Sequence, residues 1–533
     1  MSIGGYDILS IMRFVLLALI LMFPTTVFAA SEFSTSFESI YTIQESGETS
    51  VTHNIDLKNN LAHIYATEYT IQTNGEDLKN ISAIDETGDI TTETISQNGI
   101  TSIHMLITRP SIGKDQVKNI KLSYQTSDVL EQIGSTKTVN IPRLEKANES
   151  ENYKRIVKIK GVQDVPEYIY PPANSKIAED GYSVYFFDGH QGDSLTLLFG
   201  ESVTYKLNLI YELKNNEISS SDTEMALPSD TSYQHIILDS IDPKPKSIKV
   251  DSDGNWLARY NLESQSKILV KVTMFATIYP IPKLIDPSSA QTTSSLKSKY
   301  WQTNTMVADL GAKLKTPENI YKYLVDNFAY NYTDNTTRRD RLGAIAALTS
   351  PSNVLCTEFT DSFVALTRTQ NIASREINGF GYTKNGKLLP QNSNTDILHA
   401  WPEYYDADKK VWISVDPTWG NTTGGVNYFS KLDYSHIAFV RHGLEDSYPL
   451  AAGAYKSNVA DKSIIVEVAS TIPEEISNTE NINNVITNTG NVAISNSEIG
   501  YLPPYGSIQI NSSKRSSLYD KIMLICAKLL SIF

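Results

Sequence analysis

Cysteine is scarce in this sequence, with two residues among 533, Cys356 and Cys526. So few cysteines exclude a scaffold held together by disulfides, and they exclude a zinc site built from cysteines. Basic residues are also in deficit, because 60 Asp and Glu outnumber 46 Lys and Arg and give a formal net charge of -14. Nucleic acid is therefore not an expected partner, since binding to phosphates needs clustered cations.

Long apolar runs are missing as well, and a membrane-spanning helix needs roughly 20 such residues. The composition is otherwise that of folded protein, with 41% hydrophobic and 20% charged residues. At about 150 residues per domain, the chain is long enough for three or four domains. We therefore expect a multidomain globular protein.

The N-terminal segment has the order of a secretory signal. Arg13 is followed by an apolar run and by small residues up to Ala29, where cleavage is expected. Residues 1–29 are thus predicted to be the signal peptide of a secreted or cell-envelope protein, with an uncleaved membrane anchor as the alternative. The apolar tail 513–533 is too short to span a bilayer. It is predicted to form a packed or interfacial helix, with weak membrane association through this tail as the alternative.

Strand-like alternation of polar and apolar residues dominates much of the chain. Short strands at regular spacing, separated by Gly and Asn, predict a β-sandwich over residues 31–145 and a second over 146–285. Similar patterning with Asn-rich turns predicts a small β-sandwich over residues 451–512. The intervening segment, 296–450, has a different pattern.

Three helices are predicted in the segment 296–450. Thr316 followed by Pro317 is typical of a helix start, and apolar residues follow at four-residue spacing. Residues 342–348 and the stretch from Cys356 to Thr369 also have helical patterns. Strands come next, so this segment is predicted to be a mixed α+β domain.

Cys356 begins the third of these helices, with Ser352 and Asn353 as candidate capping residues. The positive end of the helix dipole favours the nucleophilic thiolate at this position. The alternative role of a lone cysteine is that of a small buried apolar side chain. An unpaired cysteine is a liability in an exported protein, and Cys526 lies in the apolar tail, so a disulfide between the two is not expected.

A nucleophilic thiolate needs a base, and His399 lies on a predicted strand that is followed by a turn and a second strand up to Asp416. If this hairpin is centred between Ala407 and Asp408, His399 and Asp416 lie directly opposite each other on one face. The carboxylate can then accept a hydrogen bond from the imidazole and fix its tautomer. A structural histidine and a turn-opening aspartate are the alternatives, but their joint placement near Cys356 favours a catalytic group.

The spacing of the other histidines does not indicate a catalytic role for them. His436 and His442 show no ligand spacing with a third group, so neither a metal site nor a cofactor is expected. The tryptophans of this segment are expected in the core and in the walls of a cleft. Arg375 is expected to form a structural ion pair.

The segment that contains Cys356, His399 and Asp416 has several short motifs. They are, in chain order, Leu342-Gly343-Ala344, Cys356-Thr357-Glu358-Phe359, Asn371-Ile372-Ala373-Ser374-Arg375, Gly379-Phe380, His399-Ala400-Trp401-Pro402-Glu403-Tyr404 and Asp416-Pro417-Thr418-Trp419-Gly420. These motifs resemble those of the microbial transglutaminase-like superfamily, over about residues 296–448. The resemblance implies a papain-like core that acts on peptide or amide bonds, with Cys356, His399 and Asp416 as the catalytic triad.

The sequence departs from this family at two places. Leu355 stands where the family often has Gly, and residues 371–375 replace the usual Gly-Ile-Pro-Ala-Arg. These departures concern the fine geometry of substrate binding and leave the triad residues in place.

The expected protein is multidomain, with an α+β transglutaminase-like core of papain-like fold flanked by β-sandwich domains. We expect an exported cysteine-dependent acyl-transfer enzyme acting on peptide or carboxamide bonds of a protein or peptide substrate, with the backbone N–H of Cys356 as an oxyanion donor. The sequence does not separate a peptidase or amidase, which uses water, from a transglutaminase, which uses an amine. A non-catalytic adhesion or assembly protein that uses its β-sandwiches is the alternative.

Overall fold

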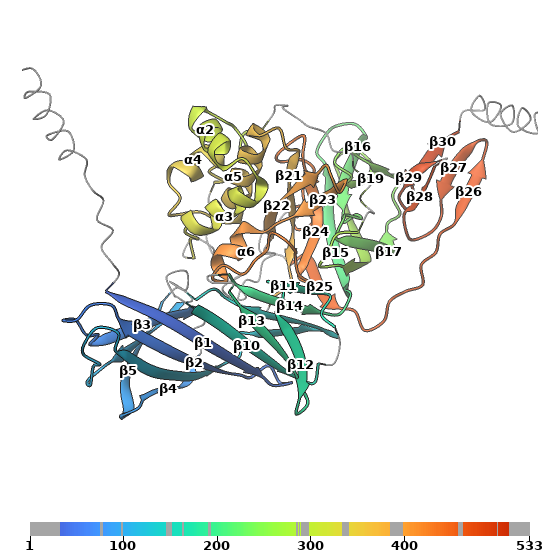
Figure 1. The fold of residues 1–533 in the computed structure, drawn as a ribbon. Coiled ribbons are helices and arrows are strands. Elements are labelled where there is room, and N and C mark those ends of the chain that lie inside the picture. Colours follow the sequence, from blue (N-terminus) through green and yellow to red (C-terminus); the bar gives the residue numbers. More distant parts are fainter. Residues whose placement is uncertain are drawn as a thin grey trace, which may run out of the picture.

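The computed structural model of the chain is rich in strands, with its helices gathered in one region (Figure 1). The predicted signal peptide, the predicted tail and Cys526 lie outside the residues that it describes. Within the described part, no helix is long and apolar enough to cross a membrane. The described residues are 32–510 except 75–77, 98–99, 145–151, 163–164, 190–192, 284–285, 287, 289–297, 333–339, 384–397, 457–461 and 498.

Two packed sheets form the first part of the molecule, here called the N-terminal β unit (residues 33–199). The larger sheet has the strand order β12-β13-β10-β1-β2-β7-β4-β5-β6-β3 and the smaller one β11-β14-β9-β8. Alternate residues along the strands are buried, and their apolar side chains form one core shared by both sheets. The strands are β1 (Phe33–Ile43), β2 (Thr49–Asn59), β3 (Glu68–Asn74), β4 (Lys79–Asp85), β5 (Gly88–Gln97), β6 (Ile100–Leu106), β7 (Val117–Thr126), β8 (Leu130–Ile133), β9 (Thr136–Ile141), β10 (Asn152–Lys160), β11 (Tyr168–Tyr170), β12 (Ser175–Glu179), β13 (Tyr182–Asp188) and β14 (Leu195–Phe199).

The larger sheet runs through the boundary predicted at residue 145. β1 pairs with β2 and, in parallel, with β10, in a register that joins Ser36 to Asn152 and Ile43 to Ile159. Sequence patterning locates strands without showing which of them pair, so the boundary between sheets is not visible in it. As a result, β10 to β14 complete the N-terminal β unit instead of opening the next one.

Two further sheets form the second β unit, with strand orders β17-β20-β15-β25 and β16-β19-β18. β15 pairs with β20 along its whole length, from Val203 to Asn215. Their inward-facing side chains pack around the fully buried Trp256. The strands are β15 (Val203–Asn215), β16 (Ser221–Leu227), β17 (Gln234–Asp242), β18 (Ser247–Val250), β19 (Trp256–Leu262), β20 (Ser266–Ile278) and β25 (Ile464–Val468).

Helices and a sheet of order β23-β22-β21-β24 form the unit that carries Cys356, here called the helical unit (Figure 1). The sheet lies between the helices and the second β unit, because β23 shares a core with α3 to α5 while β24 shares one with β15 and β20. The elements are α2 (Thr305–Leu314), α3 (Pro317–Asn327), α4 (Ala344–Thr349), α5 (Cys356–Thr369), β21 (Ser374–Gly381), β22 (His399–Asp406), β23 (Val411–Ser414), α6 (Pro417–Thr422) and β24 (His436–His442).

The helix predictions hold in this unit. α3 begins at Pro317, and the Thr316 hydroxyl accepts a hydrogen bond from the Asn319 N–H at 3.2 Å, as a capping residue does. α5 spans the predicted residues, and α4 begins two residues later than the stretch expected to be helical.

The chain returns to the second β unit after the helical unit. β25 adds to the edge of β15, and small sheets of order β26-β27-β30 and β28-β29 follow. The last strands are held to the second β unit by hydrogen bonds, such as that from the Trp256 indole N–H to the Tyr501 hydroxyl at 3.0 Å. The strands are β26 (Thr479–Ile482), β27 (Val485–Asn488), β28 (Ile494–Asn496), β29 (Gly500–Leu502) and β30 (Ser507–Gln509).

Candidate active site

Cys356 is the first residue of α5, and it is partly exposed. The buried Glu358 fixes this helix start, because one carboxylate oxygen accepts from the Leu355 N–H at 2.8 Å and the other from the Leu342 N–H at 3.0 Å. The expectation that Ser352 or Asn353 caps the helix is wrong. The cap residue is Leu355, whose apolar side chain cannot accept, so the carboxylate one turn ahead satisfies the backbone instead.

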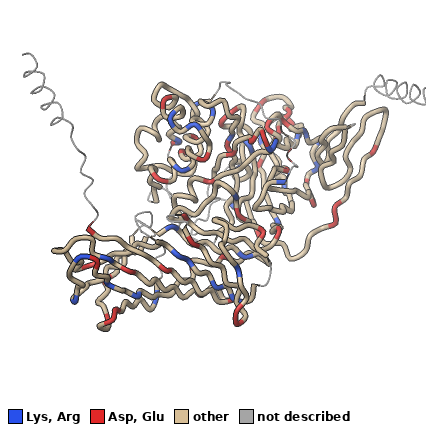
Figure 2. The backbone as a smooth tube through the Cα atoms, in the orientation of Figure 1, with Lys and Arg blue, Asp and Glu red and all other residues tan. Residues whose placement is uncertain are grey.

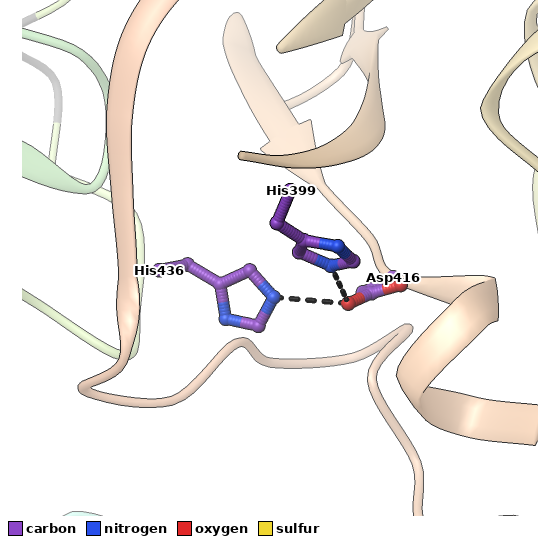
Figure 3. A group of neighbouring side chains, drawn as sticks. All are labelled: His399, Asp416 and His436. Atoms are coloured by element: carbon purple, nitrogen blue, oxygen red, sulfur yellow. Dashed lines mark hydrogen bonds and ion pairs between the residues drawn. The ribbon is translucent and has the colours of Figure 1, made fainter. Parts of the chain in front are cut away.

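His399 is the first residue of β22, and its Nε2 lies 2.8 Å from Oδ2 of Asp416 (Figure 3). The predicted cross-strand register is nevertheless wrong. Glu403 pairs with Ser414 and Asp406 with Val411, so the hairpin is centred one residue later than expected. The turn explains the shift, since its last residue, Lys410, adopts a left-handed conformation with φ 55 and lengthens the loop to residues 407–410.

Asp416 lies beyond the hairpin, at the N-cap of α6. Its Oδ1 accepts from the backbone N–H groups of Thr418 at 2.8 Å and Trp419 at 3.0 Å, which are the donors that a helix start leaves free. Its Oδ2 faces two imidazoles, because His436 Nε2 lies 3.0 Å away in addition to His399. The capping bonds therefore aim the other oxygen at the histidines.

His399 interacts with Cys356 as well as with Asp416. Since Nε2 faces the carboxylate, Nδ1 is the ring nitrogen left for the thiol. Burial opposes the charged form of His399, but the charge and hydrogen bond of Asp416, together with Cys356, raise the pKa of His399 to about 10. Burial likewise opposes ionisation of Asp416, and the two histidines outweigh it and hold the pKa of Asp416 well below its usual range.

Indole rings enclose this group. The rings of Trp401 and Trp419 stack on His399 with centroid separations of 5.6 and 5.3 Å. Both tryptophans are buried, which agrees with their expected place in the core. The stacked rings limit rotation of the imidazole and shield its hydrogen bond to Asp416 from water.

His436 is the residue that sequence reasoning missed. Its Nδ1 lies 2.7 Å from Oδ1 of Asp433, so the ring stands between two carboxylates. The three-residue spacing from Asp433 was the available signal, but nothing in the sequence connects this pair with Asp416. Polar atoms of His399, Asp416 and His436 all lie within 4.8 Å of one another, a spacing that a metal site can also have. Here the same atoms are already paired by hydrogen bonds.

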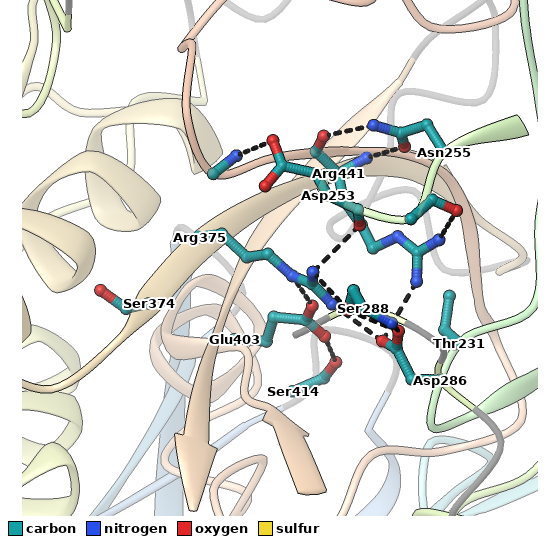
Figure 4. Close-up of polar contacts among 12 residues, drawn as sticks. Thr231, Asp253, Asn255, Asp286, Ser288, Ser374, Arg375, Glu403, Ser414 and Arg441 are labelled. Carbon is teal, nitrogen blue, oxygen red and sulfur yellow. Dashed lines mark hydrogen bonds and ion pairs between the residues drawn. The ribbon is translucent and has the colours of Figure 1, made fainter. Parts of the chain in front are cut away.

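His442 and Arg375 belong to other clusters. His442 Nε2 lies 2.8 Å from the Pro449 carbonyl oxygen, away from Asp416. Arg375 donates to Glu403 and, at 2.8 Å, to Asp286, which also accepts from Arg441 at 3.1 Å (Figure 4). All four charged groups are buried. The guanidinium of Arg375 is thus used within the protein, as expected for a structural ion pair.

Residues 302–417 match the transglutaminase-like superfamily, so this part of the chain is a transglutaminase-like domain. The match ends before Asp433 and His436. No curated protein matches the sequence.

Three solved structures to which this chain is similar come from bacteria. A candidate cysteine protease from Cytophaga hutchinsonii has 17% identity and a TM-score of 0.34, with 52% of this chain and 93% of that chain covered. The periplasmic domain of TgpA from Pseudomonas aeruginosa has 14% identity, a TM-score of 0.23 and coverages of 41% and 91%. A candidate protease from Parabacteroides distasonis has 12% identity, a TM-score of 0.24 and coverages of 76% and 73%.

Proposed function

We propose that this protein is an exported acyl-transfer enzyme that cleaves peptide or carboxamide bonds with a triad of Cys356, His399 and Asp416. The observation that carries the proposal is the hydrogen-bonded order of the three side chains inside a transglutaminase-like domain. A partly exposed thiol at a helix start, an imidazole beside it and a buried carboxylate behind are the parts that nucleophilic catalysis by cysteine requires.

In this mechanism the Cys356 thiolate attacks the carbonyl carbon of the substrate. The His399 imidazolium then gives its Nδ1 proton to the leaving nitrogen as the carbon–nitrogen bond breaks, which leaves a thioester. Neutral His399 next removes a proton from the incoming water or amine, which attacks the thioester and releases Cys356. Asp416 keeps the Nε2 proton in place throughout and stabilises the imidazolium.

The backbone N–H of Cys356 is the proposed donor to the oxyanion. As the first residue of α5, it has no carbonyl partner within the helix. Its N–H group and the helix dipole both favour negative charge at this point. The attacked carbonyl oxygen is thus expected beside the start of α5.

Glutamine-containing peptides test the proposal, with and without a labelled primary amine. Release of ammonia or peptide fragments identifies a hydrolase, and incorporation of the label identifies a transglutaminase. Cys356→Ala and His399→Ala are each expected to abolish turnover, whereas Cys526→Ser, which changes the other cysteine, is expected to retain it. Full turnover by the Cys356→Ala protein would refute the proposed triad, and lack of turnover by the parent would favour an adhesion or assembly role.

Localisation in the producing cell tests the export part separately. We expect the protein outside the cytoplasm, without residues 1–29. A full-length cytoplasmic protein would contradict export and leave the catalytic proposal intact.

A further inference from the structure

A second imidazole lies behind the proposed triad and has no role in the mechanism above. His436 is the first residue of β24, and its side chain is fully buried. Its Nε2 is 3.0 Å from the same Asp416 oxygen that faces His399 (Figure 3). The two histidines therefore hold one carboxylate oxygen between them.

The carboxylate of Asp416 has every acceptor position filled. An ionised carboxylate has about four lone-pair positions. Two backbone N–H groups occupy Oδ1, and His399 and His436 occupy Oδ2. Loss of the His436 bond leaves Oδ2 with the His399 bond alone, so the carboxylate gains freedom to turn about the α6 cap.

Asp433 sets the orientation of the His436 ring. Its Oδ1 lies 2.7 Å from His436 Nδ1 and accepts from the Ser435 N–H, also at 2.7 Å. Both nitrogens of His436 thus face carboxylates, and only the imidazolium donates to both. Burial opposes this charge, but Asp433 and Asp416 outweigh it and raise the pKa of His436.

The segment before β24 is fixed from the β units. The Tyr168 hydroxyl donates to Ser430 at 2.8 Å, and the Tyr205 hydroxyl donates to the Tyr434 carbonyl at 2.8 Å. These contacts come from the N-terminal and second β units and bracket Asp433 in the sequence. The segment that carries His436 is therefore also held by contacts from outside α6 and β22, as a reference point for Asp416 requires.

We propose that His436, oriented by Asp433, is a positioning residue that holds Asp416 and, through it, the His399 ring beside Cys356. The inference rests on the proposed function and adds a residue to its machinery. His436 does not touch the thiol, so its effect is confined to how often His399 is correctly aligned with the thiol.

Other titratable groups face this cluster and bear on any pH-dependent measurement. Lys431 is buried beside Asp433, with Nζ 4.3 Å from the centre of the Tyr428 ring. The groups that face the cluster are Cys356 of α5, His399 of β22, Tyr321 of α3, Glu131 of β8, Tyr205 of β15, and Tyr428, Lys431, Asp433 and Tyr434 of the segment before β24. The same residues are present in every His436 variant, so differences between the variants arise from the substitution at His436.

Three substitutions separate the hydrogen bond to Asp416 from other roles of His436. His436→Gln can place an amide N–H near the position of Nε2 and keep the donor to Asp416. His436→Asn places it near Nδ1, so it keeps the contact with Asp433 and loses Asp416. His436→Phe keeps a ring against Trp419, whose centroid is 4.3 Å from that of His436, and has no donor.

The readout is the rate at which iodoacetamide alkylates Cys356, where the thiolate displaces iodide. It is measured by intact mass in the full chain carrying Cys526→Ser, at about pH 6, where a thiolate requires its imidazolium partner, and at about pH 10, where it does not. We expect His436→Asn and His436→Phe to lower the rate at the acidic pH about tenfold or more and to leave the alkaline rate within about twofold. His436→Gln is expected to stay within about threefold of the parent at both pH values.

Each outcome decides a different question. If the ratio of the acidic to the alkaline alkylation rate in His436→Asn, or in His436→Phe, equals that of the parent, the positioning role is overturned and the triad is unaffected. A lowered acidic alkylation rate in His436→Gln together with a parent-like rate in His436→Phe also overturns the positioning role, because packing of the ring would then be the cause. A parent protein that reacts like a free thiol at both pH values overturns the proposed function, and the positioning role with it.

Discussion

Substitution of Asp416 by Asn tests the charge of the carboxylate while its shape is kept. The amide oxygen can still accept from Thr418 and Trp419, so the start of α6 remains capped. The amide N–H groups now point at the histidines and force His399 Nε2 to accept. The neutral ring then carries its proton on Nδ1, toward Cys356, and it can no longer take a proton from the thiol.

The magnitude follows from the pKa of His399. Its rise from 6.5 to about 10 corresponds to roughly 5 kcal/mol in favour of the imidazolium, supplied against burial by Asp416 and Cys356. A hydrogen bond to a charged group contributes about 1.5–3 kcal/mol, and a loss of roughly 2.5 kcal/mol corresponds to about 70-fold in the population of the thiolate–imidazolium pair. We therefore expect kcat/KM to fall by a factor on the order of 100.

The assay is a pH titration of the thiolate ultraviolet absorbance in the Cys526→Ser background. Near neutral pH the thiolate absorbance is expected to be larger in the parent than in Asp416→Asn, because the imidazolium that pairs with the thiolate depends on the carboxylate. Asp408→Asn is the matched control, because it removes a carboxylate from the exposed hairpin turn. A folded Asp416→Asn protein that titrates like the parent would refute the reasoning.

Further predictions concern stability. Burial lowers the pKa of His53 to about 4, so the unfolded state binds more protons than the folded state below about pH 6.5. The free energy of unfolding should therefore fall by roughly 3 kcal/mol as the pH falls from about 6.5 to about 4. Urea unfolding should show this loss in the parent and not in His53→Gln; an equal acid loss in both would contradict it. Gly379→Ala should lower the melting temperature by an amount equivalent to about 1–3 kcal/mol, because its Cβ would lie 2.2 Å from the Ile437 carbonyl oxygen, and a parent-like melting curve would show this account to be wrong. Arg441→Met should lower the free energy of unfolding by about 3–5 kcal/mol, because it leaves buried acceptors without a donor. Arg259→Met, at a half-exposed ion pair, should lower it by about 1 kcal/mol or less. Equal losses in chemical unfolding would argue against a buried network.

Local patterns in the sequence were sufficient to predict the helices near Cys356. Thr316 and Pro317 start α3 as predicted, and the apolar spacing after Cys356 gives α5, because capping and helical periodicity are properties of neighbouring residues. Asp416 was also found, although for a mistaken reason. It reaches His399 from the cap of α6, beyond the last paired residue of the hairpin, Ser414.

The pairing of strands that are distant in the chain could not be predicted from the sequence. His436 reaches Asp416 because β24 pairs with β21, across a bulge between Asn378 and Gly379, and no local pattern encodes that contact. The continuation of the first sheet past residue 145 has the same origin, since it depends on the parallel pairing of β1 with β10. Period-two patterns identify strands, whereas the partner of each strand is decided by packing of the whole chain.

The segment before β24 is attached to the β units, and this attachment limits how the catalytic segment can be transferred to another protein by evolution or by engineering. A cassette cut at the ends of the family match, 302–417, would carry the proposed triad but leave behind His436 and the tyrosine and serine contacts that fix it. The Asn427 N–H, for example, donates to Ser194 at 3.0 Å, across 233 residues of chain. Recombination that moves this catalytic segment into another protein must therefore bring the strands of the N-terminal β unit with it, or supply an equivalent brace.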